Sequence, residues 1–300
     1  MEKYFKLIRL DKPAGIFLLF WPCAWGLVIA NSSINNDILF YKFLILFFFG
    51  SVLMRSAGCV YNDIIDRKID QKVKRTSARP VAIGSVSVSQ AWSVIFLLIF
   101  LSLIILFQFN LNSIIFGLIS GILVATYPFM KRITYWPQLF LGITFNWGVI
   151  LAWLAFEGEF SFAPVLLYIS AILWTLGYDT IYGMQDIKDD LKIGIKSTSI
   201  KFEKKIKFFL LFCYLTSIGF LLVSLKLLNT NIYTYILAIL SSGILFFQIL
   251  VYEKNKPEKN FKLFALNNYY GLSIFLTLMV TINNDERQSI FRKNLSILSR

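Results

Sequence analysis

Long apolar runs separated by short polar stretches make up most of this 300-residue chain. Nine of the runs carry almost no charge, and each is close to the ~20 residues that a helix needs to cross the hydrocarbon of a bilayer. The pattern therefore predicts an all-α, polytopic membrane protein with nine spans. The expected spans are Ala14–Ala30, Leu39–Tyr61, Ala91–Phe109, Leu111–Met130, Leu139–Phe156, Phe162–Tyr178, Phe208–Leu225, Ile232–Tyr252 and Leu263–Asn284.

Composition excludes several other classes of protein. Hydrophobic residues make up 57% of the chain and charged residues 16%, with a mean hydropathy of +0.66, which is beyond the range of a soluble globular domain. The chain has no histidine, so a histidine-ligated metal and a histidine general base are both excluded. Its three cysteines (Cys23, Cys59 and Cys213) are scattered in apolar runs, so neither a zinc site nor a disulfide framework is expected.

The net charge of +13 is distributed in a way that predicts topology. Most Lys and Arg residues fall in alternate connections, and basic connections mark the cytoplasmic side of a membrane protein. The basic charge is thereby explained without a nucleic-acid partner. We expect a single transmembrane domain over residues 1–284 and a short polar, basic tail over 285–300. The basic connections are residues 1–13, 62–88, 131–138, 184–207 and 253–262.

Two acidic clusters begin where the second and sixth apolar runs end. Carboxylates so close to hydrocarbon are costly, and this indicates a functional site. On a helix, the spacing within each cluster places its polar side chains on one face. We therefore expect two columns of oxygen ligands that hold Mg²⁺ and, through it, a diphosphate. The clusters comprise Asn62, Asp63, Asp66 and Asp70, and then Asp179, Tyr182, Asp186, Asp189 and Asp190.

Two other interpretations of the acidic clusters stay open from the residues alone. The carboxylates could be solvated loop residues paired with Arg67, Lys68 and Lys188. They could also form the cation path of a transporter, but transporters place such charges near the membrane midplane. Here both clusters lie at one membrane face.

Basic side chains close to the clusters suit an anionic ligand. Arg75, Arg79 and Lys196 are candidates for phosphate binding, although the positive-inside pattern explains most of the surrounding lysines. Arg55 lies inside the second span, where an arginine needs an anionic partner. That partner is either one of the aspartates or an anionic group of a substrate, such as a carboxylate.

A tyrosine and a lysine end the fourth span four residues apart. Tyr127 and Lys131 therefore point to one face of a helix. They either line the same site or belong to an ordinary belt of Tyr and Lys at the membrane interface.

Taken together, these motifs resemble the UbiA superfamily of intramembrane aromatic prenyltransferases. The resemblance covers about residues 5–282 and implies nine helices around a central cavity. It rests on NDxxDxxxD (Asn62, Asp63, Asp66, Asp70), DxxYxxxDxxDD (Asp179, Tyr182, Asp186, Asp189, Asp190) and YxxxK (Tyr127, Lys131).

Other stretches are similar to the branch of this superfamily that prenylates 4-hydroxybenzoate in ubiquinone biosynthesis. They are residues 9–15, Trp21-Pro22, residues 55–59, residues 127–132 and residues 137–148. The resemblance implies a multi-pass protein of a bacterial inner membrane with its acidic motifs on the cytoplasmic side. The substrates would be polyprenyl diphosphate and 4-hydroxybenzoate. A naphthoate, homogentisate or haem acceptor is the alternative within the superfamily.

The resemblance also implies a role for each site residue. Asp63, Asp66, Asp186, Asp190 and Lys131 would be catalytic. Arg55 would bind the aromatic carboxylate, and Asp189 would tune the acceptor or the metal shell. Mg²⁺ would be held by Asn62, Asp63, Asp66, Asp70, Asp186 and Asp190, and the substrates by Arg55, Arg79, Tyr127, Lys131, Tyr182, Asp189 and Lys196.

Overall fold

The structure is a computed structural model that describes residues 1–34, 36–254 and 256–298. Every regular element in those ranges is a helix, which confirms the predicted all-α class. The elements are α1 (Glu2–Leu7), α2 (Ala14–Ile34), α3 (Asp37–Ile65), α4 (Arg67–Asp70), α5 (Val88–Leu106), α6 (Leu111–Thr126), η1 (Tyr127–Phe129), α7 (Met130–Ile133), α8 (Pro137–Asn146), α9 (Gly148–Glu157), α10 (Phe162–Gly183), α11 (Ile187–Ile193), α12 (Thr198–Lys201), η2 (Glu203–Lys205), α13 (Ile206–Leu227), α14 (Ile232–Val251) and α15 (Pro257–Leu298).

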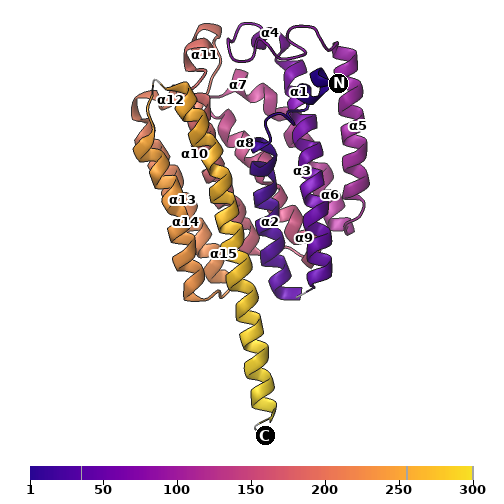
Figure 1. Cartoon of the computed structure of the whole chain (residues 1–300), viewed down its shortest axis with the longest axis vertical. Helices are drawn as coiled ribbons and strands as arrows, with labels where there is room; N and C mark the ends of the chain where they lie inside the picture. Colours follow the sequence, from indigo (N-terminus) through magenta and orange to yellow (C-terminus); the bar gives the residue numbers. More distant parts are fainter. Residues whose placement is uncertain (35, 255, 299–300) are drawn as a thin grey trace.

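Nine segments of the described chain are long and apolar enough to span a membrane, as the hydropathy pattern predicts. The fifth span is interrupted at Trp147, between α8 and α9. There the Asn146 amide donates to the carbonyl of Gly142 (2.7 Å), and such a side-chain bond competes with the helical hydrogen bonds. The last span is the first part of α15, which continues beyond the bundle as one helix (Figure 1). The tail expected at 285–300 is therefore described to Leu298 as a continuation of this helix.

Close helix packing at the centre of the bundle holds the spans in place. Helix α2 packs against α3, α9 and α15, and α10 packs against α8, α13 and α15. A Cβ on Gly26 would lie 2.4 Å from the carbonyl oxygen of Val149, so the approach of α2 to α9 requires glycine. The buried indoles of Trp25 and Trp174 lie 5.2 Å apart. The Trp25 N–H donates to the carbonyl of Gly271 (2.9 Å), so its polar hydrogen is satisfied inside the bundle.

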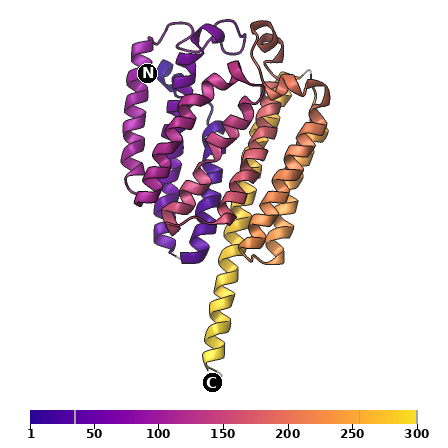
Figure 2. The ribbon, with the colours of Figure 1, turned by 180° about the vertical axis from the view of Figure 1, so that it is seen from behind.

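The short helices α1, α4, α7, α11 and α12 gather at one end of the bundle, together with the N-terminus (Figures 1 and 2). Both acidic clusters lie there and share one local architecture. A span ends, the chain turns at an aspartate, and a short helix follows: α3, Asp66 and α4 in the first cluster, then α10, Asp186 and α11 in the second.

The turn at each cluster corrects the expectation of one straight helical column of ligands. Asp66 (φ −95°, ψ 5°) and Asp186 (φ −104°, ψ −1°) lie between the ordinary helical and extended regions of the backbone. Each break redirects the aspartates that follow it, because the chain turns as it leaves the span. The side chains of one cluster therefore meet different partners.

Candidate active site

A cavity of about 1620 Å³ runs from the end that holds both clusters into the bundle. Its charged lining is at this end, and apolar residues of α3, α5, α6 and α9 line the deeper part. Along α3 the lining extends from Asp63 to Leu46, which is about 26 Å at 1.5 Å per residue. One cavity can therefore hold a polar head at its mouth and a long apolar chain below it.

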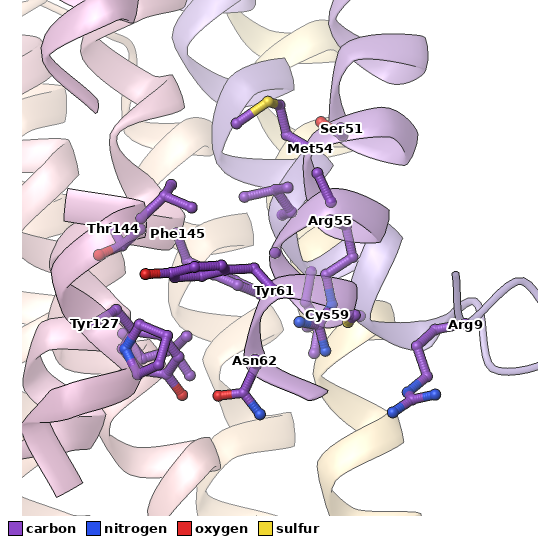
Figure 3. Close-up of a pocket in the computed structure, with 18 of the residues that line it drawn as sticks. Arg9, Ser51, Met54, Arg55, Cys59, Tyr61, Asn62, Tyr127, Thr144 and Phe145 are labelled. Carbon is purple, nitrogen blue, oxygen red and sulfur yellow. The ribbon is translucent and has the colours of Figure 1, made fainter. Parts of the chain in front are cut away.

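The first cluster ends α3, and its carboxylates are buried against cations. Asp63, 1% exposed, accepts hydrogen bonds from Arg9 at 2.8 Å and 2.7 Å and forms an ion pair with Arg79 at 3.1 Å. Arg79 also donates to Asp70 at 2.9 Å. Burial raises the pKa of Asp70 above its ordinary value, and the charge of Arg79 opposes this rise. Asn62, the residue before Asp63 on α3, also lines the cavity (Figure 3).

Asp66 has ion-pair partners different from those of Asp63 and Asp70. It is fully buried and forms ion pairs with Lys131 and, at 3.1 Å, with Arg132. It does not line the cavity, whereas Lys131 does. Asp66 was expected to bind the metal, but it contacts the site only through Lys131, which was expected to bind the diphosphate.

The second cluster is tied to the loop that follows the first. The Arg75 guanidinium donates from Nε to both carboxylate oxygens of Asp186, at 2.8 Å and 3.0 Å, and from Nη1 to the Tyr182 hydroxyl at 2.6 Å. The backbone N–H of Lys74 donates to Asp189 at 3.2 Å. These bonds join segments more than 100 residues apart in the chain and bring the two clusters to one cavity mouth.

Lys196 lines the same cavity next to the end of the fourth span. Its backbone N–H donates to the Lys131 carbonyl (2.9 Å), and its ammonium group donates to the Ile133 carbonyl (3.1 Å). In the described residues, no carboxylate lies within ion-pair distance of this ammonium group. Lys196 therefore remains available to an anion.

The carboxylates fit Mg²⁺ only when the substrate supplies part of the coordination. Among the described residues, no three acidic or cysteine side chains lie close enough to form a metal site on their own. Mg²⁺ is commonly held by one or two carboxylates together with substrate phosphate oxygens. The oxygen-only donor set at the cavity mouth suits this arrangement, with Asp63, Asp70, Asp186, Asp190 and Asn62 lining it.

The protonation of Asp190 should make the affinity for Mg²⁺ depend on pH. Burial raises the pKa of Asp190 to about 7; Asp186 acts in the same direction, and Lys131 and Arg75 oppose it. Protons then compete with Mg²⁺ below about pH 7, so affinity for Mg²⁺ without diphosphate should fall up to about tenfold per pH unit. Calorimetric titration with Mg²⁺ at several pH values between about 5.5 and 8 measures how the affinity changes with pH. An unchanged slope in Asp190→Asn would contradict the assignment.

Arg55 lies on α3, about two helical turns before Asn62, in the wall of the cavity (Figure 3). Its guanidinium lies over the ring of Phe145 at 5.2 Å. Asp179 is near enough for the charge of Arg55 to act on it, but no described carboxylate forms an ion pair with Arg55. Tyr127 also lines this region. An aromatic ring, a phenol and a guanidinium without an ion-pair partner suit a small aromatic anion.

Gly15 on α2 makes room for this guanidinium. A Cβ at this position would lie 2.7 Å from Arg55 Nε and 3.0 Å from Nη2. Gly15→Ala should therefore displace Arg55 and raise the KM for an aromatic acid by about 3- to 10-fold. This corresponds to losing part of the free energy of one hydrogen bond to a charged group. Gly58→Ala is the matched control, because Gly58 lines the same cavity and its Cβ would meet nothing within 4 Å. Equal KM values for the two variants would rule out this role.

Three residues of the site carry no assigned role in the sequence interpretation. Arg9 and Arg132 bind motif carboxylates, and the Tyr61 hydroxyl donates to the Ala125 carbonyl (3.2 Å) beside the cavity. Arg9 and Arg132 stand in basic stretches where every cation fits the topology pattern equally well. No spacing signal distinguishes them.

Solved structures share the architecture. The apo structure of a UbiA homolog from Aeropyrum pernix K1 superimposes with a TM-score of 0.72 at 22% identity, covering 88% of this chain and 97% of that one. A UbiA homolog from Archaeoglobus fulgidus bound to DMAPP and Mg²⁺ gives a TM-score of 0.59 at 17% identity, with coverage of 91% and 99%. At these identities the likeness establishes the fold.

Sequence relatives extend the comparison beyond the fold. A mitochondrial 4-hydroxybenzoate polyprenyltransferase of Bos taurus is 43% identical over 283 residues, covering 93% of this chain and 75% of that protein. A 4-hydroxybenzoate octaprenyltransferase of Coxiella burnetii (strain RSA 493 / Nine Mile phase I) is 37% identical over 292 residues, with coverage of 95% and 98%. The model of the UbiA prenyltransferase family matches residues 19–276. The chain belongs to the UbiA prenyltransferase family.

Proposed function

We propose that this protein transfers a polyprenyl group from polyprenyl diphosphate to the ring carbon of 4-hydroxybenzoate ortho to the hydroxyl, releasing diphosphate. The observation that carries the proposal is the position of Arg55, a cation without an ion-pair partner among the described residues. It lies between the carboxylate-lined cavity mouth and the apolar depth of the same cavity. The names of the relatives, which act on 4-hydroxybenzoate, support this acceptor.

The cavity mouth would bind the diphosphate of the donor. Lys131, Lys196, Arg75 and Arg79 all line it, and each can donate to phosphate oxygens. Mg²⁺, when bound through the aspartates, supplies charge neutralisation that makes diphosphate a better leaving group. The Mg²⁺ bound in the Archaeoglobus fulgidus homolog supports this cofactor.

The apolar depth of the cavity would hold the prenyl chain. Gly50 and Phe47 of α3, Leu106 of α5 and Gly117 of α6 line it, and none of them offers a charge or a strong nucleophile. Such a lining keeps water away from the allylic carbon as its bond to oxygen breaks, so hydrolysis does not compete with transfer.

Arg55 would orient the acceptor by pairing with its carboxylate. A bidentate guanidinium–carboxylate pair fixes the plane of the acid, and the ring of Phe145 limits its tilt. In the reaction, the allylic C–O bond breaks and its electron pair leaves with diphosphate. The ring carbon ortho to the hydroxyl forms the new C–C bond and then loses its proton. The chain's part is to position both substrates and to stabilise the departing negative charge.

We place the protein in ubiquinone biosynthesis, in a bacterial inner membrane with the acidic motifs facing the cytoplasm. The basic connections support this orientation, because they lie at the same end as both clusters. Other relatives are named as mitochondrial proteins, so a mitochondrial membrane is the alternative location.

A reconstituted assay tests the proposed function. Purified protein in nanodiscs receives Mg²⁺, a prenyl diphosphate and a panel of aromatic acceptors. We expect prenylated 4-hydroxybenzoate and stoichiometric diphosphate. A product formed only from a naphthoate, homogentisate or haem would assign that compound as the acceptor instead. In a parallel assay in sealed liposomes, cation flux without diphosphate release would indicate a transporter.

A further inference from the structure

We propose that Arg9 is a further diphosphate-binding residue, held by Asp63 until the metal and the donor arrive. This inference rests on the proposed function and deepens its donor site. In the structure, Arg9 Nη2 donates to both oxygens of Asp63, at 2.8 Å and 2.7 Å, and Nη1 donates to the Lys6 carbonyl at 2.7 Å. Arg9 lines the cavity mouth (Figure 3).

The backbone around Arg9 is anchored on both sides of the site. Leu7 is fully buried in an apolar cluster that includes Val60 of α3 and Ile95 of α5. The next carbonyl, that of Ile8, accepts a hydrogen bond from the Ser56 hydroxyl (3.1 Å). Any change of partner for Arg9 must therefore be made by its side chain, which cannot carry the guanidinium far from the cavity mouth.

Arg9 also has an uncommon backbone conformation. Its φ of 60° lies in the left-handed region, which costs a residue other than glycine about 1 kcal/mol or more. The anchors described above hold this conformation and direct the side chain toward Asp63. The guanidinium of Arg9 is therefore within reach both of Asp63 and of a diphosphate that enters the cavity mouth.

Metal binding at Asp63 and the Arg9 bond exclude one another. Asp63 is 1% exposed and both of its oxygens accept from Arg9, so a cation can bind there only when the guanidinium leaves. Arg79 contacts Asp63 too, but it retains Asp70 at 2.9 Å as a second partner. In the described part of the chain, Asp63 is the one carboxylate within ion-pair distance of Arg9.

The displaced guanidinium needs a new anion. Its side chain is 18% exposed in this position, and an unpaired cation so poorly solvated is costly. The diphosphate arrives with the metal at the same cavity mouth and offers oxygens in the geometry that a guanidinium prefers. Arg9 thereby exchanges Asp63 for diphosphate, while Mg²⁺ would take the carboxylate.

Binding measurements on Arg9→Gln test the exchange, with Mg²⁺ alone and inorganic pyrophosphate in saturating Mg²⁺ as the two probes. Without diphosphate, Mg²⁺ should bind the variant about 3- to 10-fold more tightly, because its competitor for Asp63 is gone. Pyrophosphate should bind about 10-fold or more weakly, because one charge-assisted contact is lost. Titration calorimetry in nanodiscs gives both affinities.

The opposite signs distinguish this role from a structural one. If Arg9 only fastens the N-terminal segment, both affinities fall together or neither changes, and either result overturns the proposal. Lys3→Gln is the control: it removes one charge and a hydrogen bond to the Ser85 carbonyl (3.1 Å) from the same segment, without touching Asp63. It should leave both affinities within about twofold.

The two probes contain no aromatic acceptor, so this test is independent of the acceptor assignment. If the affinities for Mg²⁺ and pyrophosphate shift in opposite directions in the Arg9 variant, but the wild type prenylates some other acceptor, this inference is upheld and the proposed function is overturned. If the wild type prenylates 4-hydroxybenzoate but the Arg9 variant binds pyrophosphate as the wild type does, the proposed function stands and this inference is overturned.

Discussion

Replacing Asp186 with asparagine should reduce turnover by about three orders of magnitude or more, the largest effect that we expect from one substitution. Loss of the carboxylate would remove a proposed Mg²⁺ ligand from the cavity mouth and, with it, about 4 kcal/mol of stabilisation of the departing charge. The fold should persist, because asparagine has the same shape and the Asp186 side chain makes no cap hydrogen bond at the start of α11 that could be lost. Release of diphosphate under saturating Mg²⁺ measures the loss, and thermal unfolding in nanodiscs checks the fold.

Asp37→Asn is the control for that experiment. Asp37 is the exposed first residue of α3, at the far end of the helix from Asp63, and the same chemical change there should leave turnover within about twofold. Wild-type turnover in Asp186→Asn would remove Asp186 from the metal site. Asp66→Asn adds a further comparison, because Asp66 is covered by Lys131 and Arg132. Loss of diphosphate affinity with Mg²⁺ affinity intact would make Asp66 a positioning residue for Lys131.

The second large effect is expected at Arg55. Arg55→Ala should raise the KM for 4-hydroxybenzoate by about 10- to 100-fold, the value of a hydrogen-bonded charge pair. The KM for the donor should stay near its wild-type value, because we propose that Lys131, Lys196, Arg75 and Arg79, and not Arg55, bind the diphosphate. Steady-state kinetics with each substrate varied in turn separate the two constants.

A neutral acceptor makes the test of Arg55 sharper. 4-Hydroxybenzamide keeps the ring and the phenol but lacks the negative charge, so wild type should strongly prefer the acid and Arg55→Ala should lose most of that preference. Arg55→Lys keeps the positive charge but lacks the planar guanidinium group, so its preference for the acid should lie between those of wild type and Arg55→Ala. If only the donor constants change, Arg55 belongs to the diphosphate site instead.

Helical spacing was a good guide to which residues reach the cavity and a poor guide to how they are arranged. Asp63, Asp70, Asp186 and Asp190 line the mouth, as one-face spacing suggested, whereas Asp66 and Asp189, expected on the same faces, do not line the cavity. The same spacing assumed unbroken helices, whereas the chain turns at Asp66 and again at Asp186. A turn leaves the period of the side chains before and after it unchanged, so the period carries no record of the turn.

The partners of the carboxylates were beyond the reach of the sequence for a different reason. Arg9 and Asp63 are 54 residues apart, and Arg75 and Asp186 are 111 apart. The basic connections contain many lysines and arginines that serve topology equally well. Which of them meets an aspartate depends on how the connections cross the end of the bundle.

By itself, the sequence determined the class of the molecule, its nine spans and the family motifs. Hydropathy is a sum over neighbouring residues, and the bilayer sets the length over which it must persist, so both can be evaluated along one chain. The tertiary structure decided which cations hold which carboxylates, that Asp66 faces Lys131 rather than the cavity, and that Arg55 has no ion-pair partner among the described residues. Ion pairs act over a few ångströms between segments distant in sequence, so only their relative placement in space could settle them.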